Sequence, residues 1–308
     1  MTDIHGALKD YLVVRRALGH KLVGAEYLLE QFLTYLDRSG ASTITTDLAL
    51  DWATLPVGTS AVYQAQRLSA VRCFASWLQS IEASTEVPPS DILTARPARS
   101  VPYLYTDDEI AAIMAATQSL RYPMRRCTYE GLIGLLVTTG LRIGEAIRLD
   151  RGDVCFSSGL VRVLESKFNK SREVPLHEST VQALRRYSER RDELCPEPKA
   201  PSFFLTMTGT RLVYRSVLSV FKRLLAHAGL DVCSGRGGPR IHDLRHLFAT
   251  NTLVDWHRAG VDVQAMLPLL STYMGHVDPK STFWYFSATP ELLGLVACRL
   301  EGAFEVEL

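Results

Sequence analysis

A chain of 308 residues is long for one hydrophobic core, so we expect two domains. Hydrophobic residues make up 47% of the chain and charged residues 22%, an ordinary balance for a globular protein, and no apolar run is long enough to predict a membrane span. The formal net charge of +1 argues against a protein that coats nucleic acid indiscriminately, although a local basic surface would still bind phosphate.

The start of the chain and its cysteines predict a cytoplasmic protein. Residues 1–5 supply neither the basic region nor the apolar region of an export signal. The six cysteines are scattered without a Cys-x-x-Cys pair, which is typical of small buried side chains in a reducing compartment. We therefore assign the cysteines no disulfide and no metal, and we expect no contact with a membrane.

Periodic apolar residues predict a small helical domain in the first part of the chain. Helical spacing runs through residues 7–16 and 25–36, a short helix is expected after Thr46, and a fourth helix covers residues 60–81. We therefore expect a helical domain at residues 1–86.

Prolines without apolar periodicity mark residues 87–102 as a linker, and a second domain occupies residues 103–308. Helical patterns dominate that domain, for example at residues 180–193 and 213–228, whereas residues 203–205 favour a short strand. The predicted fold class is thus mainly α with a small β-hairpin or sheet, in which a helical N-terminal domain precedes an α+β domain.

The second domain begins with a signal for a helix start. Further along, an arginine occupies a position that helix electrostatics disfavour. Thr106 and Glu109 have the spacing of a capping box. A largely apolar helix is expected at residues 129–138, and it breaks at Gly140 and restarts with Arg142 in its first turn. Because the helix dipole disfavours a cation there, Arg142 indicates either a function or a local ion pair.

Two alternating runs, residues 160–164 and 172–176, predict a β-hairpin with a basic tip. The tip carries Lys167 and Lys170, and Arg172 follows them. A lysine-bearing loop is usually only a solvated surface. Three cations on one projection would also suit contact with a phosphate.

The segment from Ile241 to Tyr285 brings together groups that can act on a phosphate. Read as a helix, its first residues place His242 and Arg245 on one face, because they are three apart. His276 follows, and Arg240 belongs to a glycine-rich basic stretch that leads into the segment. We interpret the segment as surrounding one phosphate.

The candidate set suits metal-free attack on a phosphodiester. Arginines recognise phosphate oxygens in a bidentate manner and stay charged, while histidine exchanges protons near neutrality. A tyrosine has a pKa of about 10, so it needs a base and a stabilised transition state to act as a nucleophile. No acidic metal cradle is evident in the sequence. The six candidate catalytic residues are Arg142, Lys167, His242, Arg245, His276 and Tyr285.

Five motifs in order resemble the tyrosine recombinases, also called the phage integrase family. They are Thr-Gly-Leu-Arg-Ile-Gly-Glu-Ala at residues 139–146, Lys-Phe-Asn-Lys-Ser-Arg-Glu-Val-Pro-Leu at 167–176, His-Asp-Leu-Arg-His at 242–246, Met-Gly-His at 274–276 and Thr-x-x-Tyr at 282–285. The resemblance covers the second domain closely. The first domain looks like the family's core-binding domain, but only in its pattern of helices.

The resemblance implies a role for each candidate residue. Tyr285 would attack the scissile phosphate and form a 3′-phosphotyrosyl bond. Arg142 and Arg245 would hold the non-bridging oxygens, and Lys167 would protonate the leaving 5′-oxygen. His242 would assist the proton transfer that involves the tyrosine.

The resemblance also implies that His276 would orient the scissile phosphate. Three further basic residues, Lys170, Arg172 and Arg240, are expected to contact DNA phosphates outside the catalytic set. The choice of Lys167 over Lys170 as the acid rests on the family pattern, since the chemistry of the two side chains is the same.

The resemblance also implies the partners. The expected function is a site-specific DNA recombinase or integrase, with no cofactor, metal or ATP, that acts on double-stranded DNA carrying a specific recombination site. The family assembles as a tetramer on two duplexes, and a helix that starts near Pro290 would dock on a neighbouring protomer or on its own.

Three alternatives stay open in the sequence. A type IB topoisomerase would share the catalytic set, and a non-catalytic DNA-binding relative would be expected to have lost one of the six groups. His242 and His246 are close to a zinc-enzyme spacing, but Asp243 replaces the required glutamate and Arg245 would repel a cation. Tyr285, flanked by Phe283 and other aromatics, would in isolation be a core residue.

Overall fold

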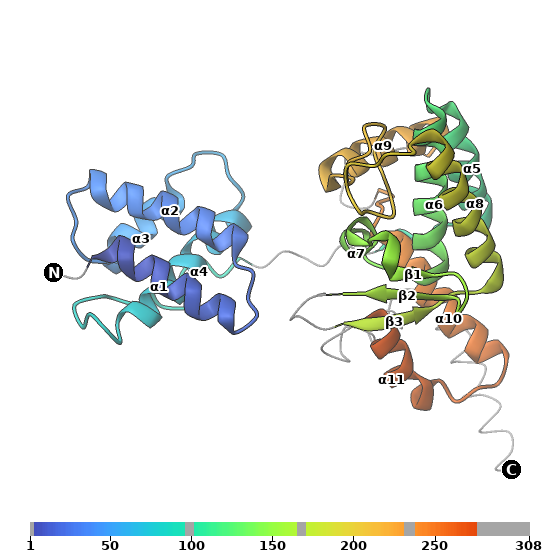
Figure 1. Ribbon diagram of the computed structural model, residues 1–308. Helices are drawn as coiled ribbons and strands as arrows, with labels where there is room; N and C mark the ends of the chain where they lie inside the picture. The colour runs from blue at the N-terminus through green and yellow to red at the C-terminus, as the bar shows by residue number, and fades with distance from the viewer. Residues whose placement is uncertain (1–2, 96–101, 165–170, 231–237, 276–308) are drawn as a thin grey trace, which may run out of the picture. The chain divides into compact units, whose positions relative to one another are not determined.

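The computed structural model describes residues 3–95, 102–164, 171–230 and 238–275. The chain forms two compact units, Met1–Arg99 and Ser100–Leu308 (Figure 1). Within the described ranges, the helices are all too short or too polar to cross a lipid bilayer.

The first unit is a packing of helices around one hydrophobic core. Asp3, Thr45 and Ser60 cap helices with their side chains, each accepting a hydrogen bond from a backbone N–H in the first turn. In that core Phe32 meets Trp52 edge to face, with ring centroids 5.2 Å apart. The helices are α1 (Ile4–Ala17), α2 (Val23–Arg38), α3 (Thr46–Thr54) and α4 (Ala61–Leu78).

Residues that follow α4 are fastened to the first unit. Arg72 donates from Nε to the carbonyl of Pro88 and from Nη2 to the carbonyl of Pro89, both at 2.7 Å. Ile92 and Leu93 then pack against the helical core. This part of the proline-rich stretch 87–102 therefore lies on the surface of the first unit.

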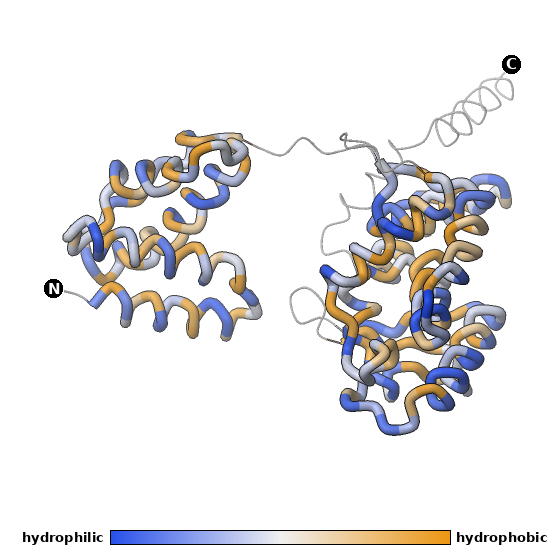
Figure 2. The backbone as a smooth tube through the Cα atoms, turned by 90° about the horizontal axis from the view of Figure 1, so that it is seen from above, coloured by the Kyte–Doolittle hydropathy of each residue, from blue (hydrophilic) through white to orange (hydrophobic). Residues whose placement is uncertain are grey.

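Helices dominate the second unit, as the sequence patterns predict. The capping box of Thr106 and Glu109 is present, because Thr106 Oγ1 accepts from the Glu109 N–H while Glu109 Oε2 accepts from the Thr106 N–H. Hydrophobic and hydrophilic residues are interspersed along the helical turns (Figure 2). The α-helices are α5 (Asp107–Ala116), α6 (Pro123–Thr139), α7 (Ile143–Arg148), α8 (Glu178–Leu194), α9 (Tyr214–His227), α10 (Asp243–Arg258) and α11 (Val263–Met274).

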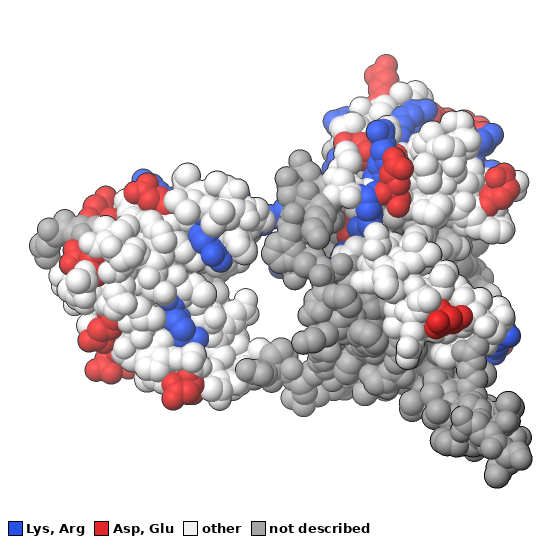
Figure 3. Space-filling model, turned by 90° about the horizontal axis from the view of Figure 1, so that it is seen from below, with Lys and Arg blue, Asp and Glu red and all other residues white. Residues whose placement is uncertain are grey.

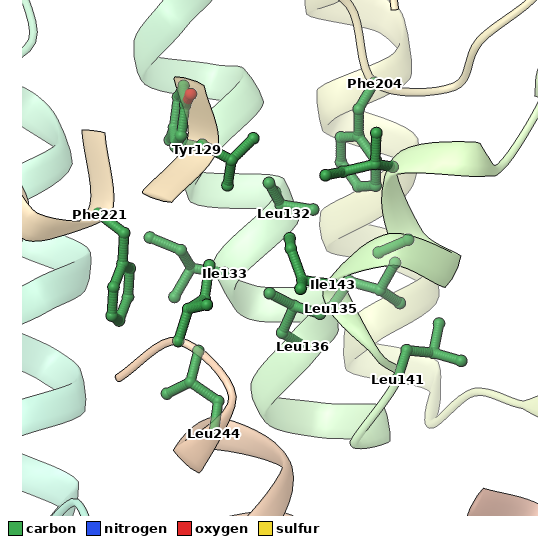
Figure 4. Packing of buried hydrophobic residues seen from close by; sticks show 14 of the residues in the cluster. Tyr129, Leu132, Ile133, Leu135, Leu136, Leu141, Ile143, Phe204, Phe221 and Leu244 are labelled. Atoms are coloured by element: carbon green, nitrogen blue, oxygen red, sulfur yellow. The ribbon is translucent and has the colours of Figure 1, made fainter. Parts of the chain in front are cut away.

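Helix α6 is the centre of the second unit, and it packs against α8, α10, α5 and α7. Its buried side chains include Leu132 and Ile133, which meet Phe221 of α9 and Leu244 of α10 in one cluster (Figure 4). Because α6 is apolar on several sides, α7 and α10, which respectively follow Arg142 and carry Arg245, both pack against this one support, whereas α11 packs against α10 and β3.

A small antiparallel sheet lies beside these helices, with strands β1 (Val154–Cys155), β2 (Leu160–Val163) and β3 (Arg172–Pro175) in the order β1-β2-β3. Val161 pairs with Val174, and both are buried. The predicted hairpin is thus confirmed in its two strands, while β1 was not foreseen.

The short strand predicted at residues 203–205 is wrong. Only isolated bridges form there, Asp150 with Ser202 and Leu205 with Arg211. Phe203 and Phe204 are both fully buried, so the apolar run reflects a loop that fills the core and not a strand with one buried face.

Candidate active site

A glycine turn between α6 and α7 holds the first catalytic candidate in place. Gly140 ends α6 with φ +60°, a left-handed conformation that suits glycine. A Cβ at this position would lie 2.5 Å from Cδ1 of Phe248, so the close approach of α10 also requires glycine. The carbonyl of Gly140 accepts a hydrogen bond from Nη1 of Arg245 at 2.7 Å.

Arg142 is the residue before α7 and not part of its first turn. Its guanidinium donates from Nη1 to Glu145 Oε1 at 2.8 Å and from Nη2 to the Gly275 carbonyl at 3.1 Å. The ion pair offsets the unfavourable helix dipole. The side chain keeps 30% of its surface exposed, so it can still meet a ligand.

Glu145 lies buried between two arginines. Its side chain is 2% exposed, and its carboxylate accepts from Arg142 and, at 2.9 Å and 3.2 Å, from Nη2 and Nη1 of Arg172. Burial raises the pKa of Glu145, but the hydrogen bonds and charge of Arg172, together with the charge of Arg142, outweigh it and lower the pKa to about 2. Glu145 is therefore an anion that fixes two cations.

Arg245 is anchored from both sides. It lies in the first turn of α10 and is buried. Nη1 donates to the Gly140 carbonyl, and Nη2 donates to the Met274 carbonyl at 2.6 Å. The guanidinium thus joins the end of α6 to the end of α11, two segments far apart in the sequence.

His242 immediately precedes α10, so the predicted sharing of one helical face with Arg245 is only approximate. The residue is exposed, yet desolvation by the surrounding protein lowers its pKa, and the charges of Arg245, Arg142 and Arg240 lower it further. Its ring meets that of His246 at right angles, with centroids 5.3 Å apart. His242 is thus in its neutral form near pH 7, in which it can accept a proton.

Arg240 makes a local contact with α10. Asp243 is fully buried and accepts from Arg240 Nε at 2.9 Å and from Nη2 at 2.8 Å. The Tyr105 hydroxyl donates to the Arg240 carbonyl at 3.0 Å. These bonds fix the start of α10, and with it His242.

The last turn of α11 is the meeting point of three arginines. Consecutive carbonyls of Tyr273, Met274 and Gly275 accept from Arg172, Arg245 and Arg142 respectively. Carbonyls at a helix C-terminus lack intrahelical partners and carry partial negative charge, so they attract cations. Gly275 follows α11 with φ +66°, and His276 is the next residue in the chain.

The structure brings together part of the predicted site. Arg142, His242 and Arg245 lie on elements that converge on residues 273–275 and on Glu145. Lys167, Lys170, His276 and Tyr285 lie outside the described residues. Sequence reasoning assigned no role to Glu145, although its place three residues after Arg142 in a short helix was a usable signal.

The side chain of Tyr273, whose carbonyl belongs to this cluster, is half-buried. Burial raises its pKa to about 12 although Arg172 lowers it, and its ring stacks on Phe248 with centroids 5.4 Å apart. Such a phenol is a poor nucleophile. Within the described ranges, no group of three or more His, Cys, Asp or Glu side chains is placed to hold a metal ion.

Comparisons with known proteins agree with these motifs. Residues 104–291 match the model of the phage integrase family. The Sinorhizobium fredii protein that carries the name integrase/recombinase y4rB is 40% identical over 99% of this chain and 99% of its own. Tyrosine recombinase XerC of Chlamydia caviae is 29% identical over 74% of this chain and 68% of its own.

Solved structures share the fold at low sequence identity. A lambda integrase dimer bound to a COC′ core site is 17% identical, with a TM-score of 0.64 over 93% of this chain and 96% of that one. XerH bound to a palindromic difH substrate is 20% identical, with a TM-score of 0.62 over 84% and 73%. The predicted fold class, mainly helical with a small antiparallel sheet, is confirmed.

Proposed function

This chain belongs to the phage integrase family, and from that premise we propose that it is a site-specific tyrosine recombinase that cleaves and rejoins double-stranded DNA. The observation that supports this most directly is the anchoring of Arg142 and Arg245 on the neighbouring carbonyls of Gly275 and Met274. Two guanidiniums fixed at one point, one of them partly exposed, suit the non-bridging oxygens of a phosphodiester.

The proposed reaction is a transesterification with Tyr285 as the nucleophile. The phenolic oxygen forms a bond to phosphorus, and the bond from phosphorus to the 5′-oxygen breaks, leaving a 3′-phosphotyrosyl bond. Lys167 gives a proton to the 5′-oxygen, and neutral His242 assists removal of the phenolic proton. Arg142 and Arg245 stabilise the charge that builds up on the non-bridging oxygens, an effect typically worth about 10²- to 10³-fold in rate for each donor.

The remaining basic candidates keep smaller proposed roles. His276 follows Gly275 directly and would donate a hydrogen bond to the same phosphate. Lys170 stays a proposed contact to a neighbouring phosphate. Arg240 is about half exposed beside Asp243, so it can also approach the DNA backbone.

One phosphodiester is exchanged for another, so the step needs no ATP, and the cations of the site can neutralise the phosphate without a metal or cofactor. A lambda integrase tetramer bound to a Holliday junction is among the solved structures similar to this chain. We propose the same assembly here, with four protomers on two duplexes. The segment from Pro290, which lies outside the described residues, would dock on a neighbouring protomer or on its own, and the reaction would take place in the cytoplasm.

Capture of the covalent intermediate tests the proposal. Protein expressed in cells that hold the DNA of its own genomic region is denatured and purified, and any attached DNA is sequenced. We expect one short site, joined through its 3′ end, for the wild type and for Tyr273→Phe, and none for Tyr285→Phe. An adduct that survives Tyr285→Phe, or attachment through a 5′ end, would contradict the proposal.

The captured site then separates recombination from simple relaxation of DNA. Two linear duplexes that carry the site are incubated with the protein, and exchanged products are measured. A recombinase joins arms of different duplexes, whereas a type IB topoisomerase only relaxes supercoils and rejoins the original strands. A relative without catalytic activity would yield no adduct at the preceding step.

A further inference from the structure

Arg172 stands at the centre of the contacts that fix the two phosphate-binding arginines. It is the first residue of β3, and its side chain is only 11% exposed. Nε donates to the Tyr273 carbonyl at 2.8 Å, while Nη1 and Nη2 donate to the two carboxylate oxygens of Glu145. One guanidinium therefore ties β3 both to α7 and to the end of α11.

Glu145 and the turn at Tyr273, the two partners of Arg172, also hold the proposed phosphate-binding pair, Arg142 and Arg245. Glu145 holds Nη1 of Arg142 at 2.8 Å. The turn that Arg172 fixes through Tyr273 presents the next two carbonyls, from Met274 and Gly275, to Arg245 and Arg142. A shift of Arg172 would therefore move the supports of both arginines together.

The fit around Arg172 is close. A Cβ on Gly275 would lie 2.7 Å from Nη1 and 2.9 Å from Cζ of Arg172, so the turn can pack on the guanidinium only because residue 275 is glycine. The buried carboxylate of Glu145 would be left without most of its compensation if this cation were removed. Geometry and charge thus both specify a planar guanidinium at this position.

We propose that Arg172 is a positioning residue that aligns Arg142 and Arg245 for the transition state, and not the DNA-phosphate contact that its place in the basic hairpin suggests. The inference rests on the proposed function. It predicts that Arg172 contributes to the rate of cleavage and very little to the affinity for DNA, because its guanidinium is turned toward protein groups.

A single-turnover cleavage assay tests this role. The substrate is a nicked duplex that carries the captured site and loses its short 5′-hydroxyl fragment after cleavage, so that the covalent adduct accumulates. The variant is Arg172→Lys, which keeps a positive charge beside Glu145 but cannot bond Glu145 and the Tyr273 carbonyl in the same fork. Arg151→Ala is the control, since Arg151 forms an exposed ion pair with Asp192 in the same unit.

Three quantities are measured for each protein: the rate constant at saturating protein, the final fraction of DNA trapped, and the affinity at several salt concentrations. For Arg172→Lys we expect a rate constant lower by about 10- to 100-fold, since a small misalignment of catalytic groups has effects of this size. The trapped fraction, the affinity and the salt dependence stay at wild-type values. Arg151→Ala matches the wild type throughout.

Other outcomes overturn the inference in recognisable ways. Weaker binding with a salt slope reduced by about 1 identifies a phosphate contact. A lower trapped fraction with an unchanged rate constant identifies a role in folding alone, and a variant equal to wild type shows no role. If the wild type itself forms no adduct, the proposed function fails, and this inference fails with it.

Discussion

Single residues carry the charge balance of the site, and Glu145 is the clearest case. Its carboxylate is 2% exposed and hydrogen-bonded to two arginines, so it stays ionised at pH values well below the ordinary pKa of a glutamate. Its motif was recognisable in the sequence, but spacing along the chain could not show that Arg172, on a strand, would be its second partner. Pairing between elements is decided by packing, and sequence periodicity does not report it.

The pKa of Glu145 predicts how stability changes with pH. The folded pKa of about 2 lies below the reference value of 4.5, so the contribution to stability is fully present above about pH 5 and is lost as the pH falls toward 2. The shift corresponds to about 3 kcal/mol. The free energy of unfolding of the second unit, measured by urea denaturation between pH 6 and pH 3, should fall more steeply for the wild type than for Glu145→Gln. Parallel slopes would contradict this assignment.

The lowered pKa of His242 predicts how the cleavage rate changes as the pH falls. Because desolvation and nearby arginines lower its pKa below 6.5, the decline of the rate toward acid pH should be centred below pH 6.5. The measurement is the single-turnover rate constant as a function of pH at saturating protein. A decline centred above pH 7 would show that a different group limits the rate.

At the scale of elements, the junctions between helices matter more to the site than the helices themselves. The ends of α6 and α11 supply the carbonyls that anchor Arg245, and both ends are closed by glycines with positive φ. The sequence predicted the break at Gly140 and the restart after it. It could not predict that Phe248 of α10 would press against that turn.

Gly140→Ala tests this junction against a matched control. Alanine at Gly140 meets both the strain of φ +60° and a Cβ contact of 2.5 Å to Phe248. Gly159 has a similar φ of +63°, but its nearest Cβ contact is an ordinary 3.6 Å to Val181. Gly140→Ala should therefore reduce the free energy of unfolding by about 1–3 kcal/mol more than Gly159→Ala. Equal losses in urea denaturation would mean that the strain alone matters.

Sequence patterns predicted most helices of both units, but they missed α11 (Val263–Met274) and predicted the irregular segments poorly. The helix that carries Arg245 and the hairpin that carries Arg172 were both expected. The apolar run at residues 203–205 was misread because a fully buried loop and a buried strand have the same composition. The carbonyl cluster at residues 273–275 left no signal apart from its glycine, since backbone groups are common to every sequence.

At the scale of the whole molecule, charge does not identify the function. Basic and acidic side chains are interspersed on the face shown in Figure 3, in keeping with the net charge of +1. The proposed binding to DNA would therefore depend on a few placed cations. The six proposed catalytic residues are widely separated in the sequence of the second unit, and the order of their motifs predicted the family.

Attachment of the proline-rich stretch to the first unit is a feature that can be tested separately. Arg72 makes two charge-assisted hydrogen bonds to the carbonyls of Pro88 and Pro89. In Arg72→Ala, thermolysin should cut near Ile92 and Leu93 at least about tenfold faster, because even one such bond is worth about 1.5–3 kcal/mol. Arg38→Ala, at an exposed position of α2, serves as the control. Equal cutting rates in both variants would show that apolar packing alone holds this stretch.

The central claim, that Tyr285 attacks a phosphate held by Arg142 and Arg245, is tested most directly by mass spectrometry of the covalent adduct. The trapped complex is digested with protease and nuclease, and the peptide that carries a nucleotide is sequenced. The account predicts a 3′-linked nucleotide on Tyr285 for the wild type, and a strongly reduced yield for Arg142→Ala and Arg245→Ala. A nucleotide on any other residue, or full yield after loss of either arginine, would contradict it.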